Sequence, residues 1–233
     1  MTALAELTRL CPPPETSPRP VGWDDVETRL GIRLPGDYKR LASVYGPGVF
    51  AGCIHVFHPH GASEWVDLTG PVPAGAREQL SRDRERGTHP VPHDPRRLFA
   101  MAGTDNGERL FRITDPQDAP DTWRVTVNEA RGPRWFTFGG TLTRFLFAVL
   151  SGGTTVPQFP GDLLDQAMRF TPSSPVPRTP PGPPDPSPVA TETVREWARA
   201  HGYDVPARGR VPAGIIEAWE RAGRPGAGGA GQG

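Results

Sequence analysis

Lysine and cysteine are scarce in this chain of 233 residues. Lys39 is the single lysine among 26 basic residues, so the others are arginines. This composition is typical of a GC-rich genome, in which an Arg-rich motif by itself carries little information. The two cysteines, Cys11 and Cys53, match no metal-binding spacing and cannot form a disulfide framework. We therefore expect two reduced thiols in a reducing cytoplasm.

Long apolar runs are also missing. The longest lies near residues 144–150, far short of the roughly 20 residues that a membrane-spanning helix needs. The first residues, "MTALAELTRLCPPP", have no basic region followed by an apolar run, so they do not form a signal peptide. These absences predict a soluble cytoplasmic protein without membrane contact.

The chain has no net charge, because 26 acidic residues balance 26 basic ones. Such a balance argues against a protein coated in nucleic acid or lying on an acidic membrane. Any contact with nucleic acid must therefore be local.

Composition divides the chain into four parts. Residues 171–190 are dominated by proline and serine, which favour extended conformations and cannot bury a core, so we interpret them as a semi-stiff linker. Residues 224–233 are Gly-rich, and we expect them to be disordered. The linker separates a domain over 1–170 from a small domain over 191–223.

The first 170 residues combine helical and strand patterns. Apolar residues at helical spacing predict helices over 3–10, 23–30, 35–46 and 141–150. Alternating apolar and polar residues predict strands over 49–57, 63–70, 97–104, 108–114, 122–130 and 134–140. Asn106-Gly107 between two of these segments is a strong hairpin signal. The pattern indicates an α+β domain with an antiparallel sheet and flanking helices.

Three segments carry a resemblance to a known family. They are "WDDVETRLGIRLPGDYKRLASVYGPGVF" (23–50), "GTDNGERLFRITDPQDAPDTWRVTVNEA" (103–130) and "TLTRFLFAVLSG" (141–152). Together they resemble the SUKH superfamily of Smi/Knr-type domains over about residues 1–155. The resemblance implies a SUKH-like α+β fold and a non-catalytic interaction role. Many relatives are immunity proteins that neutralise toxins, and others regulate diverse partners.

Most residues that carry this resemblance have side chains suited to structural roles. We expect the large apolar ones in the core and the glycines at turns: Trp23, Leu34, Tyr38, Tyr45 and Trp123, and Gly46, Gly48 and Gly107. Glu27 and Asp37 could bind a ligand, but capping or ion pairing is the favoured interpretation. The partner surface cannot be predicted from these residues.

The segment 191–223 predicts two short helices joined by a loop. The first begins at a capping box of Thr193 and Glu196, and Gly202 is placed to end it. The second begins at Pro212 and ends at Gly223. A very small core is predicted from Trp197, Tyr203, Ile215 and Trp219. This all-α helix-loop-helix unit is too small to be more than marginally stable alone.

Both helices and the loop resemble the C-terminal DNA-binding module of Lsr-type nucleoid-structuring (histone-like) proteins. The matching residues are Val194, Arg195, Trp197, Ala198, Gly202, Arg208, Gly209, Arg210, Val211, Pro212, Ala213, Glu217, Ala218 and Trp219. The resemblance implies DNA binding through the loop. The oligomerisation domain of that family is missing from this chain, so DNA bridging is not implied.

The loop residues suit a narrow minor groove. Arg208 and Arg210 carry guanidinium groups that the negative potential of A·T-rich grooves attracts, and Gly209 has no side chain to hold the backbone away. The minor groove mainly distinguishes A·T from G·C, so we expect a preference for composition. Arg195 and Arg199 are candidates for phosphate contacts.

Charge limits the expected affinity. Residues 190–224 contain six arginines against five acidic residues, so few counterions would be released on binding. We expect modest affinity for A·T-rich duplex unless the first domain self-associates and supplies avidity. A merely structural or protein-binding role for this unit stays an alternative.

No motif predicts catalysis, a metal or a cofactor. His55, His58 and His60 lie close together in sequence, as do His89 and His93, but no acidic or cysteine ligand clusters with them. Phosphate-binding loops, G-x-S-x-G and paired cysteines are missing. A hydrolase without a recognisable motif stays an alternative.

These observations predict a non-catalytic, nucleoid-associated regulatory protein in the cytoplasm. It would contact DNA through Arg208, Gly209, Arg210, Arg195 and Arg199, and a protein partner through the first domain. The alternative is a toxin-immunity or regulatory protein that acts through the first domain. Neither the partner nor the oligomeric state follows from the sequence.

Overall fold

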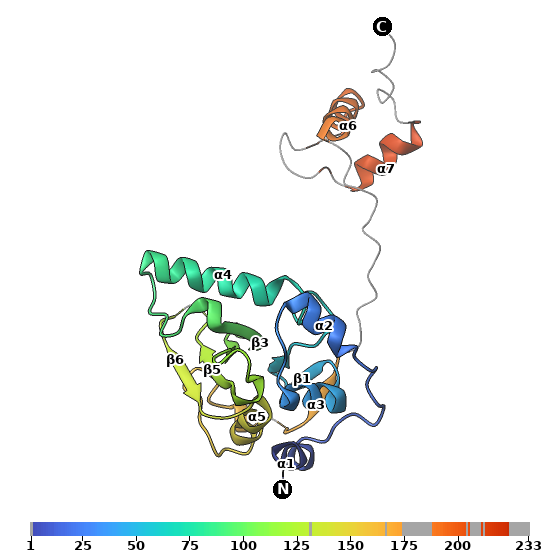
Figure 1. The fold of residues 1–233 in the computed structure, drawn as a ribbon. Helices are drawn as coiled ribbons and strands as arrows, with labels where there is room; N and C mark the ends of the chain where they lie inside the picture. Colours follow the sequence, from blue (N-terminus) through green and yellow to red (C-terminus); the bar gives the residue numbers. More distant parts are fainter. Residues whose placement is uncertain are drawn as a thin grey trace. The chain divides into compact units, whose positions relative to one another are not determined.

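The computed structural model describes residues 2–130, 132–165, 167–173, 188–203, 205, 211 and 213–223. The chain divides into two compact units, Met1–Val176 and Pro177–Gly233. The first unit is an α+β fold, as predicted, and the second contains two helices among its described residues (Figure 1).

A sheet of seven strands forms the centre of the first unit. The strands lie in the order β6-β5-β4-β3-β2-β1-β7, and every neighbouring pair is antiparallel. Their bounds are β1 Gly48–Phe50, β2 Ile54–Val56, β3 Leu98–Thr104, β4 Arg109–Ile113, β5 Arg124–Asn128, β6 Trp135–Phe138 and β7 Phe170–Pro172. The predicted hairpin turn at Asn106-Gly107 joins β3 to β4, and Gly107 has a φ of +96°.

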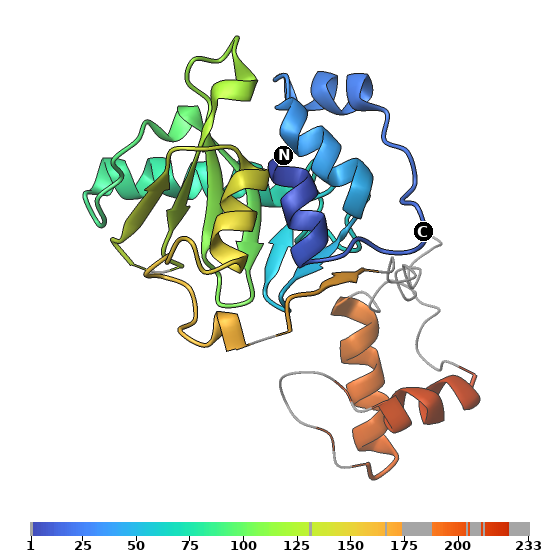
Figure 2. The ribbon, with the colours of Figure 1, turned by 90° about the horizontal axis from the view of Figure 1, so that it is seen from below.

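Helices cover both faces of this sheet. Helix α4 runs along one face, and α3 and α5 lie on the other (Figure 1). Seen from below, α1 and α5 lie in front of the sheet and α4 behind it (Figure 2). The helix bounds are α1 Ala3–Leu10, α2 Trp23–Leu30, α3 Gly36–Tyr45, α4 Pro71–Arg86 and α5 Leu142–Leu150, with short 3-10 turns at Pro95–Arg97, Pro120–Thr122 and Leu163–Asp165.

The predicted core residues and helices of this unit are largely confirmed. Leu34, Tyr38, Tyr45 and Trp123 are buried. Trp23 is partly buried on α2, with its ring 5.7 Å from that of Tyr38 on α3. The four helices predicted from apolar spacing occur within one residue of their predicted ends.

Three predicted features of this unit are wrong. The run 49–57 is not one strand, because a turn at residues 51–53, with positive φ at Ala51 and Gly52, divides it into the antiparallel strands β1 and β2. Residues 63–70 are irregular and make a single β-bridge, between Asp67 and His58, instead of a strand. The carboxylate of Asp67 accepts hydrogen bonds from the amide and the hydroxyl of Thr69, and such local bonding competes with a strand ladder. Gly48 is in strand β1 and not at a turn. A Cβ at this strand position would clash with the ring of Phe170 on β7.

Two elements were not predicted. Helix α4 has Pro71 at its first position and ends at Gly87 in a left-handed conformation, but its sequence is largely polar and only Val72, Pro73 and Leu80 are buried. Strand β7 pairs with β1 and includes Thr171 and Pro172, so the sheet continues past the change in composition at residue 171.

Glu27 and Asp37 have structural partners. The carboxylate of Glu27 accepts a hydrogen bond of 2.6 Å from the amide of Leu34 and lies 2.5 Å from the Lys39 ammonium. Although burial opposes the shift, these two contacts lower the pKa of Glu27. Asp37 Oδ2 accepts a hydrogen bond from the amide of Thr143, which joins α3 to α5.

Asp37 also faces a buried cation on the sheet. Its Oδ1 lies 3.7 Å from Nη2 of Arg112, whose side chain is 1% exposed on β4. Burial lowers the pKa of Arg112, and the charge of Asp37 partly opposes this shift. The pair therefore connects α3 with the centre of the sheet. In this buried region, either charge without the other would destabilise the fold.

Candidate nucleic-acid interface

The second unit is built on two amphipathic helices. Helix α6 spans Pro188–Ala200 and helix α7 spans Ala213–Arg221. Helix α6 begins five residues before the predicted capping box, so Thr193 lies inside the helix and is not its N-cap. Proline suits the first turn of a helix because it lacks a donor that would be unpaired there, which explains the earlier start.

The end of α6 agrees with the prediction. Gly202 has a φ of +78°, and the amide of Tyr203 donates a hydrogen bond of 2.9 Å to the carbonyl of Ala198. Glycine tolerates the left-handed conformation that ends a helix in this way. The chain therefore turns sharply after α6, toward the predicted loop.

A small apolar cluster holds the two helices together. Its buried members come from both helices and from the chain between them: Val194, Ala198, Val205, Val211, Ile215 and Trp219. Trp197 and Ile216 are partly buried against this cluster. Three of the four predicted core residues therefore belong to it or pack on it.

The prediction for Tyr203 is wrong, because its side chain is 43% exposed. The ring instead stacks on Trp197, with centroids 5.7 Å apart and an interplanar angle of 23°. His201 stacks on the same indole at 4.5 Å, and its Nδ1 lies 2.8 Å from the carbonyl of Trp197. A proton on Nδ1 can be donated to that carbonyl, so the stack secures the C-terminal end of α6.

Two valines define where the predicted DNA-binding loop begins and ends. Val205 is 8% exposed and Val211 is 4% exposed, and both belong to the apolar cluster. Sequence reasoning did not select either valine for the core, although both are apolar residues at the ends of a polar segment. The predicted residues Arg208, Gly209 and Arg210 stand between them and lie outside the described residues.

The predicted phosphate contacts lie one turn apart on α6. Arg199 is exposed in the last turn, and Arg195 is partly buried. A cation near the C-terminus of a helix interacts favourably with the helix dipole. Because Arg199 is exposed, an anion can reach it at the C-terminal end of α6. The chain continues from this end of the helix to Val205.

The histidines and cysteines of the first unit form no obvious reactive site. His55 lies 2.7 Å from Asp105, while His58 is buried and accepts a hydrogen bond from the amide of His60. Within the described ranges, no group of three or more histidine, cysteine or acidic side chains could hold a metal ion. Cys11 and Cys53 are free thiols, and burial raises the pKa of each to about 11.

Among the described residues, no helix is both long enough and apolar enough to span a membrane.

Comparison with known proteins finds a match for the second unit. Residues 186–222 match the family model of the Lsr2 DNA-binding domain. The match spans α6, α7 and the segment that contains Arg208, Gly209 and Arg210. No curated protein and no solved structure matches the chain. The resemblance of the first unit to SUKH domains stays a prediction, whereas the C-terminal part of the chain is similar to a DNA-binding domain, which supports a nucleoid-associated role.

Proposed function

We propose that this protein is a non-catalytic regulator that binds A·T-rich duplex DNA through its second unit. Arg208 and Arg210 enter the minor groove, and Gly209 allows the backbone to approach its floor. The observation that carries the proposal is the match of residues 186–222 to a DNA-binding domain.

The apolar cluster of the second unit supports this role. Val205 and Val211 are both buried in the apolar cluster. The cluster therefore anchors the two ends of the five-residue segment between them. Anchoring both ends of a binding segment reduces the conformational entropy that is lost on binding. This arrangement suits insertion of two arginines into a groove.

Phosphate contacts come from α6 in this proposal. Exposed Arg199 contacts the backbone beside the groove, and Arg195 one turn earlier adds a second cation. The acidic residues Glu192 and Glu196 are exposed on the same helix and reduce its net charge. The affinity of one unit is therefore modest and falls as salt is raised.

Fluorescence anisotropy with the full chain tests the proposal. A labelled A·T-rich duplex and a G·C-rich duplex of equal length are titrated at low and at moderate salt. We expect salt-sensitive binding that favours A·T, and roughly a tenfold or greater loss of affinity when Arg208 and Arg210 are both replaced by alanine. Arg221→Ala, which removes one exposed cation from the end of α7, is the matched control and should have a small effect.

Two results would contradict this assignment. The double variant would bind as tightly as the parent if the loop arginines make no contact. Equal affinity for both duplexes would show contact with phosphates but not with the minor groove.

A second function concerns the first unit, which we propose to be a SUKH-like domain that binds a toxin or a regulatory protein. Its large apolar side chains Trp65 and Leu164 are more than half exposed, and exposed apolar groups often belong to interaction surfaces. A toxin gene as immediate neighbour would favour this function, and the test is then a titration with the product of that gene. Binding should survive in the Arg208→Ala/Arg210→Ala variant, and loss of binding in that variant would assign the contact to the second unit.

A further inference from the structure

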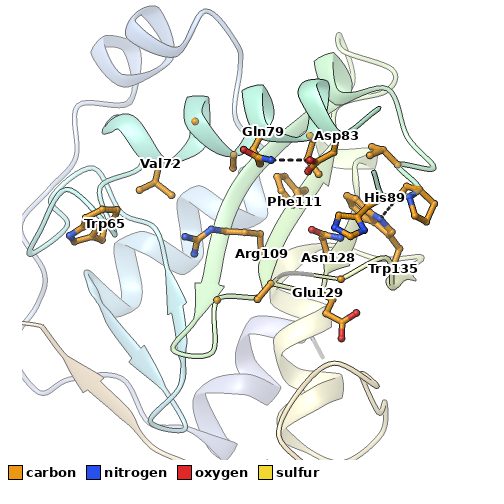
Figure 3. A pocket seen from close by; sticks show the side chains of 18 of the residues that line it. Trp65, Val72, Gln79, Asp83, His89, Arg109, Phe111, Asn128, Glu129 and Trp135 are labelled. Carbon is orange, nitrogen blue, oxygen red and sulfur yellow. Dashed lines mark hydrogen bonds between the residues drawn. The ribbon is translucent and has the colours of Figure 1, made fainter. Parts of the chain in front are cut away.

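A cavity of about 480 Å³ lies between helix α4 and the sheet of the first unit (Figure 3). Its volume falls within the range of roughly 300–1,000 Å³ that small-molecule sites occupy. The DNA-binding role of the second unit does not account for it.

Apolar and aromatic groups form most of the wall. Helix α4 contributes Val72, Ala76 and Leu80, while Phe111 on β4 and Trp135 on β6 form the opposite side. These side chains can accommodate a flat hydrocarbon body.

The aromatic side of the cavity is held in place. Nε1 of Trp135 donates a hydrogen bond of 2.9 Å to the carbonyl of Pro90, and the Trp135 ring lies 6.0 Å from that of Phe111. Trp65 at the opposite end is 65% exposed, so an apolar ring stands where a ligand could cover it. The Trp135 side of the cavity is therefore held in position by contacts within the protein.

One cation enters this apolar space. Arg109 lies two residues before Phe111 on β4, so both side chains project from the same face of the sheet. Its guanidinium points toward the end of the cavity that Trp65 and Val72 line (Figure 3). Gly103, its cross-strand partner on β3, leaves room for it, since a Cβ there would lie 2.5 Å from Nη1 of Arg109.

Arg109 makes no ion pair with any carboxylate in the described part of the chain. Burial lowers the pKa of its guanidinium, and no neighbouring charge opposes that shift. A half-buried cation without a counter-charge is unfavourable, and an anionic ligand would relieve it.

The acidic residues of the cavity are engaged elsewhere. Asp83 accepts hydrogen bonds from Nε2 of Gln79 at 2.9 Å and from the hydroxyl of Thr88 at 3.1 Å. Glu129 pairs with Arg134, which lowers the pKa of Glu129. Both carboxylates lie away from the guanidinium of Arg109 in Figure 3, so the end of the cavity near Trp65 is positive and the rest is mainly apolar.

We propose that this cavity binds a small organic monoanion with an aromatic or aliphatic body. The anionic group, a carboxylate or a sulfonate, pairs with Arg109, and the body lies between α4 and the rings of Phe111 and Trp135. A small molecule suits a cavity of about 480 Å³ that holds a single unpaired cation among apolar side chains.

Two fluorescent probes that differ in one group test the proposal on the full chain. 8-Anilinonaphthalene-1-sulfonate carries an anion, and N-phenyl-1-naphthylamine has the same body without it. We expect one equivalent of each to bind, with the anionic probe tighter. Arg109→Met, which removes the charge but keeps the apolar stem, should weaken the anionic probe roughly tenfold or more and leave the neutral probe unchanged.

Two further variants separate the site from general surface binding. Arg144→Met removes an exposed cation from α5 on the opposite side of the sheet and should change neither affinity. Ala76→Leu fills the cavity from a helix that accepts leucine well, and should weaken both probes. The proposal is wrong if Arg109→Met and Arg144→Met behave alike, or if Ala76→Leu leaves both probes bound as before.

Discussion

Replacing Ile215 by alanine should weaken DNA binding severalfold without removing any group that we place on DNA. Ile215 is buried on α7 in a cluster whose other buried members number only five: Val194, Ala198, Val205, Val211 and Trp219. Ile216, the next residue, is only partly buried and provides a matched control with the same side chain. The two variants differ in how much of the isoleucine the cluster encloses.

The magnitude follows from the size of the unit. A core this small rarely supplies more than about 3–5 kcal/mol of stability, and a buried Ile→Ala change costs about 2–5 kcal/mol. With a stability of about 3 kcal/mol and a loss of about 4 kcal/mol, the unit stays folded in roughly 15% of molecules. The apparent Kd for DNA then rises about sixfold, because only the folded fraction binds.

Two assays on the full chain measure this effect. Hydrogen exchange of the peptides that cover 188–223 reports whether the unit is folded, and anisotropy with an A·T-rich duplex reports binding. Ile215→Ala should lose both amide protection and affinity, whereas Ile216→Ala should keep most of each. The reasoning is refuted if Ile215→Ala loses affinity while its amides stay protected, or if the two variants lose protection equally.

Two further predictions concern the first unit. Asp37→Ala leaves the Arg112 guanidinium buried without its counter-charge and should lower the free energy of unfolding by about 3–5 kcal/mol, as measured by urea denaturation. The double variant Asp37→Ala/Arg112→Met should recover much of the stability that Asp37→Ala loses. If its loss of unfolding free energy equals the sum of the losses in the two single variants, the role of the ion pair is contradicted. His58 has a pKa lowered by burial to about 4 from 6.5, so the unfolded chain takes up its proton first and stability should fall as the pH drops from 6.5 toward 4. The decline, at most about 1.4 kcal/mol per pH unit, should be shallower in His58→Gln, and parallel pH profiles for the two proteins would exclude this contribution.

The elements predicted correctly are those with a strong local pattern. Helix α5 has Leu142, Phe145, Leu146 and Val149 on one buried stripe, and the predicted hairpin at Asn106-Gly107 joins β3 to β4, with Gly107 alone of the two at a positive φ. Helix α4 has no such stripe, because its sequence is largely polar and only Val72, Pro73 and Leu80 are buried. It forms where tertiary contacts hold it on the sheet, and its low apolar content hides that from sequence patterns.

The DNA-binding interface was accessible to sequence reasoning for a similar reason. The residues that carry the resemblance lie within about 30 consecutive positions, between Val194 and Trp219, so their spacing is visible along the chain. The stacking of Tyr203 on Trp197 and the anchoring by Val205 and Val211 were not predicted. Both features depend on how the chain turns after α6. The apolar character of a residue does not by itself decide whether its side chain enters the core or lies on the surface.

By itself, the sequence determined that this chain has an α+β domain with an antiparallel sheet and a C-terminal segment similar to a DNA-binding domain, because both follow from short-range periodicity and motif spacing. Only the tertiary structure placed Arg109 beside Phe111 and Trp135 under α4, and paired Arg112 with Asp37 on the other face. Arg109 and Arg112 are three residues apart on one strand and project to opposite sides of the sheet. Their surroundings depend on strand register and on helices distant in sequence, which local patterns do not encode.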